Sequence, residues 1–191
     1  MEADAQLLDR ARMLDKAALG KIFDLYSSPL YCYALRLCGD PVLADHVVAD
    51  VFAKLLDQFS SGKGPSANLR SYLYEIAYHR IIDEQRSSRR KVTLETVEWI
   101  RQDRNAAHTS LEDLLLFKQI LHAMRNALSN DQRHVVILRF LEGFSLRETA
   151  AIIGKNVQNV KVIQSRAIVA LRKALEDNRL KRAAPSSDAD K

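Results

Sequence analysis

Two histidine–aspartate pairs have a spacing that could hold a metal: His46 with Asp50, and His79 with Asp83. Residues four positions apart share one face of a helix, and imidazole with carboxylate is a common ligand combination for transition metals. Two such helices facing each other would give a helical metal-dependent enzyme. Helical di-metal sites also use several Glu ligands, and no matching set accompanies these pairs. This enzyme interpretation is therefore the weakest of the alternatives.

Other catalytic patterns are missing from the sequence. It contains no Gly-x-x-x-x-Gly-Lys phosphate loop and no Gly-x-Ser-x-Gly nucleophile motif. Cys32 and Cys38 are six residues apart, which fits neither a CxxC metal pair nor the disulfide framework of a small secreted domain. No apolar run approaches the ~20 residues of a membrane span. We expect a cytoplasmic protein without catalytic residues, metal, cofactor or membrane insertion.

A different set of side chains, near the C-terminus, could bind nucleic acid. At ~100° per residue, one side of a helix around position 165 is apolar and the other is polar. The polar side carries Gln158, Lys161, Val162, Ser165 and Arg172, and the apolar side Val160, Ile163, Ala167 and Leu171. Glutamine can bind adenine edges, lysine can bind guanine or phosphate, and a small apolar group can touch a thymine methyl. An ordinary helical hairpin with a solvated face is the alternative.

The charge distribution favours the nucleic-acid interpretation. Residues 154–182 contain eight Lys or Arg and only two Asp or Glu, whereas residues 1–60 contain six and nine. Clustered positive charge attracts a polyanion, because neutralised phosphates release their counterions. The helix at 158–172 follows a short amphipathic helix that starts at Ser145, and Gly154 with Asn156 can end the first helix and cap the second. This arrangement predicts a helix-turn-helix.

The remaining chain also reads as helical. Apolar residues recur at intervals of three and four, and strand-type alternation is nearly absent. Asp40-Pro41 predicts a helix start that runs to about Phe59, and Asn68 can cap a helix to about Arg90. Capping boxes mark three further starts: Ser110-x-x-Asp113, Ser129-x-x-Gln132 and Ser145-x-x-Glu148. The prediction is an all-α protein with two small helical domains, 1–90 and 110–177, joined by a linker at 91–109 and followed by a disordered tail at 178–191.

Longer motifs occur in both halves of the chain. One set runs from Leu128-Ser129-Asn130-Asp131-Gln132 through Gly143-Phe144-Ser145 to Ser165-Arg166-Ala167. The other lies at Leu30-Tyr31-Cys32-Tyr33-Ala34, at residues 44–52 and at residues 73–86. With these motifs the chain resembles bacterial RNA polymerase sigma factors of the extracytoplasmic-function group. The resemblance implies that the C-terminal domain binds the upstream, minus-thirty-five promoter element and the polymerase flap. Gln158, Lys161, Ser165 and Arg166 would then contact duplex DNA.

For the N-terminal domain, the resemblance implies polymerase docking and capture of melted DNA. The helix with Asp45, His46, Ala49 and Asp50 would dock on the polymerase clamp, although His46 and Ala49 stand where the family usually has Asp and Gln. The next helix carries a stripe of about 60° that suits single-stranded DNA, because bases stack on aromatic rings and arginines follow phosphates. The stripe comprises Tyr72, His79, Asp83, Arg86 and Arg90. Ordinary surface ion pairs on a solvated helix are the alternative explanation for it.

The expected partners are core RNA polymerase and promoter DNA, with an anti-sigma factor as a further partner that would clamp the two domains together. The expected function is that of a sigma factor, which helps the polymerase to recognise and melt promoters. The main rival is a self-sufficient regulator, in which only the helix-turn-helix touches DNA and the N-terminal helices sense or dimerise. Such a regulator would bind its operator without polymerase.

Overall fold

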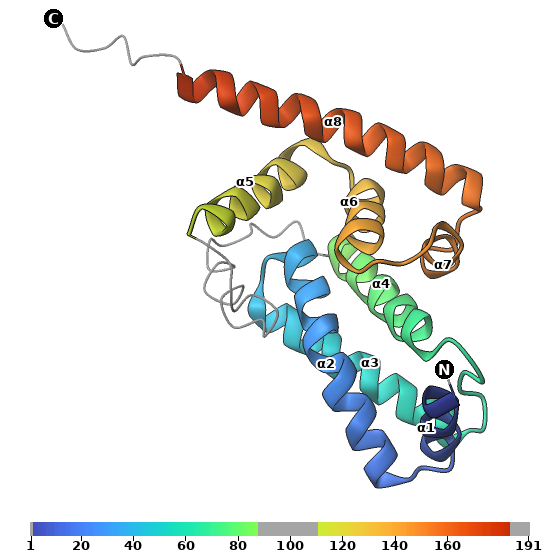
Figure 1. Ribbon diagram of the computed structural model, residues 1–191. Helices are drawn as coiled ribbons and strands as arrows, with labels where there is room; N and C mark the ends of the chain where they lie inside the picture. Colours follow the sequence, from blue (N-terminus) through green and yellow to red (C-terminus); the bar gives the residue numbers. More distant parts are fainter. Residues whose placement is uncertain (1, 88–110, 184–191) are drawn as a thin grey trace, which may run out of the picture.

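The computed structural model describes residues 2–87 and 111–183, and all the regular secondary structure in these residues is helical (Figure 1). This confirms the all-α prediction. The first half contains α1 (Glu2–Arg12), α2 (Lys16–Cys38), α3 (Pro41–Ser60) and α4 (Leu69–Ser87). The second half contains α5 (Leu111–Ala127), α6 (Asn130–Val136), a π-helical turn η4 (Ile137–Leu141), α7 (Leu146–Ile152) and α8 (Val157–Ala183).

Aspartate caps begin the two long helices of the first half. The Asp15 carboxylate accepts hydrogen bonds from the amides of Ala17 and Ala18, and the Asp40 carboxylate does the same for Val42 and Leu43. These bonds satisfy amides that have no acceptor within the first turn of a helix. The predicted start at Asp40 is confirmed, and α3 ends at Ser60, one residue beyond the expected position.

Helix α4 begins where the sequence predicts, at Leu69, directly after Asn68. Asn68 has a φ of 53°, in the left-handed region that asparagine tolerates better than most residues. The helix is described to Ser87, so the expected end near Arg90 and the expected linker at 91–109 lie outside the described residues.

Two capping boxes organise the second half, and both were predicted. The Ser129 side chain accepts from the Gln132 amide while the Gln132 side chain accepts from the Ser129 amide, and Ser145 pairs with Glu148 in the same way. Ser110 lies outside the described residues, and α5 begins at the next position. Helix α8 continues to Ala183, so residues 178–183 are helical although the tail was expected to begin at 178. The sequence Arg179-Leu180-Lys181-Arg182 has good helix propensity, which favours continuation of the helix.

The two halves pack on one core. Helices α2, α3 and α4 lie side by side, and the second half rests on α4 and on the C-terminal end of α2 (Figure 1). Helix α8 lies on the side of the molecule farthest from α1 and α3, with α5, α6 and α7 beneath it. Tyr33 of α2 and Tyr74 of α4 are fully buried against His134 and Phe144 of the second half. None of the described helices is long and apolar enough to cross a membrane.

Candidate nucleic-acid interface

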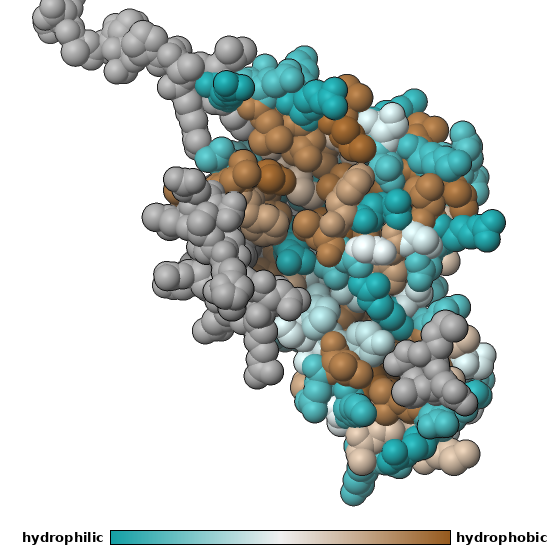
Figure 2. Space-filling model, in the orientation of Figure 1, coloured by the Kyte–Doolittle hydropathy of each residue, from teal (hydrophilic) through white to brown (hydrophobic). Residues whose placement is uncertain are grey.

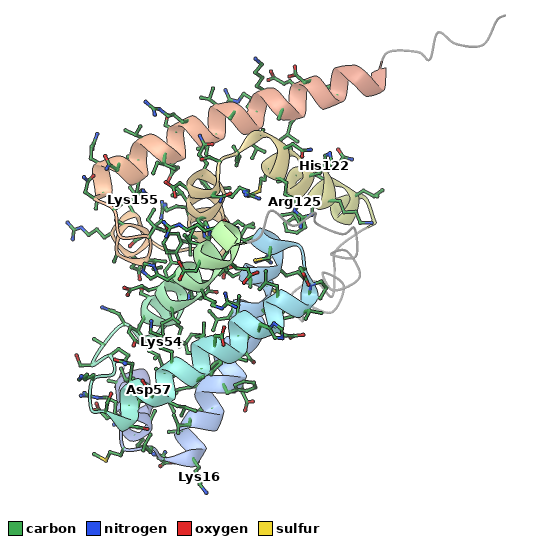
Figure 3. The ribbon with its side chains drawn as sticks, turned by 180° about the vertical axis from the view of Figure 1, so that it is seen from behind. Lys16, Lys54, Asp57, His122, Arg125 and Lys155 are labelled. Atoms are coloured by element: carbon green, nitrogen blue, oxygen red, sulfur yellow. The ribbon has the colours of Figure 1, made fainter. Side chains whose placement is uncertain are left out.

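The predicted helix-turn-helix is formed by α7 and α8. Gly154 ends the first helix with a φ of 63°, a conformation that costs little without a Cβ. Asn156 caps the second helix, since its Oδ1 accepts a hydrogen bond of 2.7 Å from the Asn159 amide. The turn is also tied to α6 by an ion pair of 3.1 Å between Lys155 and Asp131. Figure 3 shows Lys155 at this turn, beside α6.

The two faces of α8 are separated as the sequence predicts. Val160 and Ala167 are fully buried, and Ile163 and Leu171 are half-buried. The opposite face consists of exposed side chains: Gln158, Lys161, Val162, Ser165 and Arg166. None of these five makes a side-chain hydrogen bond or ion pair to another described residue. The face is therefore available to an external partner.

Arg172 lies farther along α8, about 21 Å from Gln158 at 1.5 Å per residue. It borders an apolar groove of about 700 Å³ between α5, η4 and α8. Figure 2 shows hydrophobic residues gathered below α8 on the side of α5. The apolar lining residues are Phe117, Ile120, Leu121, Met124, Val136, Phe140, Leu141, Ile168, Leu171 and Leu175. Arg172 thus belongs both to the predicted DNA face and to the edge of this groove, which the sequence analysis did not identify.

On α4 the predicted stripe is exposed but partly occupied by internal contacts. Tyr72 is half-buried, and burial, with a smaller effect of Glu75, raises the pKa of its hydroxyl. The His79 ring meets the Tyr78 ring edge-on, with centroids 5.3 Å apart. Asp83 and Arg86 form a largely exposed ion pair of 3.8 Å, as the alternative explanation of the stripe supposed. Arg90, the last member of the stripe, lies outside the described residues.

The predicted docking residues on α3 fall into two groups. Asp45, His46 and Ala49 are exposed and share one stripe of the helix. Asp50 points toward α4, where its carboxylate accepts a hydrogen bond of 2.6 Å from Arg80. Arg80 also bonds Glu84, so Asp50 belongs to an interhelical network.

Apolar residues complete the exposed stripe of α3, and the sequence analysis missed them. Val42 is 63% exposed and Leu56 42% exposed. Phe52, on the same stripe, packs against the half-exposed Phe23 of α2 with ring centroids 4.8 Å apart. The spacing of 42, 45, 49, 52 and 56 follows the three- and four-residue period of one helix face and was a signal that could have identified these residues.

The structure does not assemble the metal site considered from the sequence. Among the residues whose side chains the structure describes, no group of three or more His, Cys, Asp or Glu could hold a metal ion. His46 and His79 are exposed on separate helices, and Asp50 pairs with Arg80 instead.

Comparisons with known proteins agree with this arrangement. The family model described as Sigma-70 region 2 matches residues 22–91, and the model described as Sigma-70, region 4 matches residues 126–173. The second match contains the helix-turn-helix, and the first contains the helices with the α3 and α4 stripes.

Individual relatives extend over most of the chain. The ECF RNA polymerase sigma factor BldN of Streptomyces coelicolor is 30% identical over 177 residues, which cover 91% of this chain and 66% of BldN. The ECF RNA polymerase sigma factor SigX of Bacillus subtilis is 29% identical over 161 residues, covering 81% of this chain and 82% of SigX. A solved structure of the sigma factor RpoE with the anti-sigma factor NepR from Bartonella quintana shares the fold. Its TM-score is 0.62 at 24% identity, with 82% of this chain and 96% of that chain covered.

Three observations agree with one another. The two family regions occur in the expected order, the relatives match nearly the whole chain, and the helix-turn-helix has an exposed polar face. The chain belongs to the extracytoplasmic-function group of bacterial RNA polymerase sigma factors, which act in transcription initiation and are not enzymes.

Proposed function

We propose that this sigma factor recognises promoters through two surfaces on two domains. In this proposal residues 1–90 bind the polymerase clamp and the melted minus-ten strand, and residues 110–177 bind the upstream duplex, with residues 91–109 as the connection. The observation that carries the proposal is the outer face of α8, where Gln158, Lys161 and Ser165 stand exposed beside one another over a buried inner face.

The first turns of α8 have the dimensions of a major-groove reader. Gln158 to Ser165 spans about 10 Å along the helix, which corresponds to roughly three base pairs. Gln158 and Val162 can address base edges, and Lys161 and Arg166 can address phosphates. Arg172 is too far along α8 to share these base pairs, so we assign it to the DNA backbone or to the edge of the groove.

For the melted strand we propose the stripe of α4. The half-buried Tyr72 ring would stack with one unpaired base. The His79 ring, which contacts the Tyr78 ring, would stack with a second. Arg86 can follow the phosphates, and Arg90 remains part of the proposed set. Asp83 would orient Arg86 through their ion pair, since a carboxylate repels the phosphates themselves.

For core RNA polymerase we propose two docking surfaces. The α3 stripe with Asp45, His46 and Ala49 would contact the clamp, and the apolar residues Val42 and Leu56 extend that contact. The apolar groove between α5, η4 and α8 would receive the flap, because a contiguous exposed apolar surface typically marks a protein interaction site. Asp50 contributes indirectly, through its pairing with Arg80 of α4.

We also propose an anti-sigma partner and a cytoplasmic location. RpoE of Bartonella quintana, which shares this fold, is seen in complex with the anti-sigma factor NepR. An anti-sigma factor of this chain would bind both domains and compete with polymerase. A purified candidate anti-sigma factor should suppress sigma-dependent transcription in proportion to its concentration. A candidate that binds this chain but leaves transcription unchanged at saturation would not be its anti-sigma factor.

The test of the proposed function is run-off transcription by purified core RNA polymerase on a fragmented genomic DNA library, with and without this protein. Transcripts that depend on the protein and start at discrete sites are expected, and their upstream sequences would reveal both promoter elements. DNA binding without polymerase, together with no dependent transcript, would instead support the stand-alone regulator.

A further inference from the structure

The contact between the two halves of the chain is centred on one glutamate. Glu142 follows η4 and is directed into the first half, where Arg36 donates to its Oε1 at 2.8 Å and Tyr74 donates to its Oε2 at 2.5 Å. Arg70 donates to its backbone carbonyl. Both carboxylate oxygens and the carbonyl of one residue are therefore bonded to α2 and α4. The Glu142 side chain is only 7% exposed and that of Arg36 19%.

The backbone around Glu142 is shaped for this contact. Its amide bonds the carbonyl of Ile137, the five-residue bond of a π-helical turn, and Gly143 then takes a φ of 72°. This course brings Phe144 under the Arg70 guanidinium, which lies 4.1 Å from the ring centroid, and beside Tyr74. A π-helical turn interrupts regular helix geometry and is frequently found at functional positions.

A second contact lies beside the first and is incompletely satisfied. The Tyr33 hydroxyl and His134 Nδ1 are 2.7 Å apart, and both side chains are fully buried. His134 Nε2 is also buried and has no hydrogen-bond partner among the described residues. Separation of the two halves would return His134 Nε2 to water, where it can form a hydrogen bond. This unpaired nitrogen therefore lowers the free-energy cost of separating the halves.

We propose that Glu142 is a latch that holds the polymerase-free chain closed, and that the latch is released when the two domains span a promoter. Removal of the carboxylate leaves Arg36 and the Tyr74 hydroxyl without their acceptor inside the contact, which penalises the closed arrangement specifically. The open arrangement pays no such penalty, because the same groups then face water.

Promoter geometry explains why the latch must open; this step depends on the proposed function. The minus-ten and minus-thirty-five elements are about 25 base pairs apart, roughly 85 Å of duplex at 3.4 Å per pair. A compact chain of this length is only about 40 Å across. The closed form exposes both proposed DNA surfaces but cannot place them that far apart. The 23 residues between Ser87 and Leu111 can cover up to about 80 Å, so the covalent connection permits the opening.

The test is a distance measurement between spin labels in the free, full-length chain. Labels at Ala53→Cys on α3 and Lys173→Cys on α8 use exposed positions in the two halves. The natural thiols Cys32 and Cys38 are buried, and burial raises the pKa of the Cys38 thiol to about 12, so they should label slowly. One short distance is expected for the unsubstituted chain. Glu142→Ala should add a second, longer distance, because the ratio of open to closed molecules should rise about tenfold or more.

Matched variants separate a latch from damage to the fold. Arg36→Ala, in the other half, should open the chain to a similar degree, and combining it with Glu142→Ala should add little, because both remove one shared contact. Glu75→Ala removes an exposed glutamate of α4 and should leave the distance unchanged. Far-UV circular dichroism should show the same helix content for all of these variants.

Either of two results would overturn the latch: Glu142→Ala keeps the single short distance with its helix content intact, or Glu75→Ala opens the chain as far as Glu142→Ala does. If Glu142→Ala loses helix content, Arg36→Ala and Tyr74→Phe test the latch instead, because these substitutions leave η4 and α7 unchanged.

Titration with core polymerase tests whether the latch is released on binding. Glu142→Ala should bind with a lower apparent Kd, because a larger fraction of molecules is already open. An open chain with an unchanged Kd would show that polymerase binding does not require release.

Discussion

The proposed DNA surfaces on α8 and α4 differ in how firmly the rest of the molecule holds them. On α8, Lys161 and Arg166 project from the helix and contact no other described side chain by a polar bond. On α4, Tyr72 is half-buried in the edge of the core and His79 leans on Tyr78. The α8 face can adjust to base edges, whereas the α4 face offers rings in fixed positions. Function and stability should therefore separate cleanly on α8 and less cleanly on α4.

The largest predicted effect contrasts the two sides of α8. Val160→Asp should lower the free energy of unfolding by about 4 kcal/mol, because it places an unpaired carboxylate at a fully buried position. Val162→Asp, at a position 40% exposed, should change it by only about 0.5 kcal/mol while weakening DNA binding through charge repulsion. Urea unfolding and a duplex-binding assay measure the two effects. Equal destabilisation by both substitutions would mean that the faces of α8 are not separated.

The next prediction compares the exposed α4 stripe with the buried contact between the two halves, where His134 meets Tyr33. Burial, and to a smaller degree Arg133, lowers the pKa of His134 to about 3. His134 stays neutral in the folded chain, whereas in the unfolded chain it takes up a proton near pH 6.5. Its contribution to the free energy of unfolding is therefore fully present above that pH. It should fall by about 1.4 kcal/mol per pH unit as the pH drops below 6.

Urea unfolding between pH 7 and pH 4.5 measures this dependence. His134→Gln should remove that part of the slope, and His79→Gln, at an exposed position, is the matched control. A slope that persists unchanged in His134→Gln would assign the dependence to other groups.

A third prediction compares two serines of the second domain. Ser145→Ala removes the capping box of α7 and should cost about 1 kcal/mol in the free energy of unfolding. Ser165→Ala, on the exposed face of α8, should cost less than about 0.5 kcal/mol and should weaken duplex binding. Thermal unfolding and DNA titration separate the two, and a destabilising Ser165→Ala would show that this face is structural.

The smallest effect distinguishes two neighbours on α8. Lys161→Ala should reduce the slope of log binding constant against log salt concentration by about 0.9, since one phosphate's counterions are no longer released. Gln158→Ala should leave that slope unchanged and relax the preference for one base pair. Fluorescence anisotropy on the upstream duplex at several salt concentrations measures both. An unchanged slope in Lys161→Ala would exclude Lys161 from the interface.

Local patterns predicted much of this molecule from its sequence. The Asp40 cap, the boxes at Ser129 and Ser145 and the two faces of α8 all depend on residues close together in the chain, which periodicity and capping rules describe well. The contacts between the halves did not follow from such patterns. Tyr33 and His134 are 101 residues apart, and Glu142 bonds to Arg36 and Tyr74, which precede it by 106 and 68 residues. The pairing of Asp50 with Arg80 was missed because it depends on how α3 and α4 pack.

The most direct test of the central claim, that the two surfaces serve two different promoter elements, uses one promoter and two variants. Permanganate footprinting with core polymerase reports strand opening, and protection of the upstream duplex reports its binding. Lys161→Ala should weaken upstream protection at sub-saturating protein, with strand opening restored at saturation. Tyr72→Ala should keep upstream protection and reduce strand opening even at saturation. Loss of the same single step in both variants would contradict the division between α8 and α4.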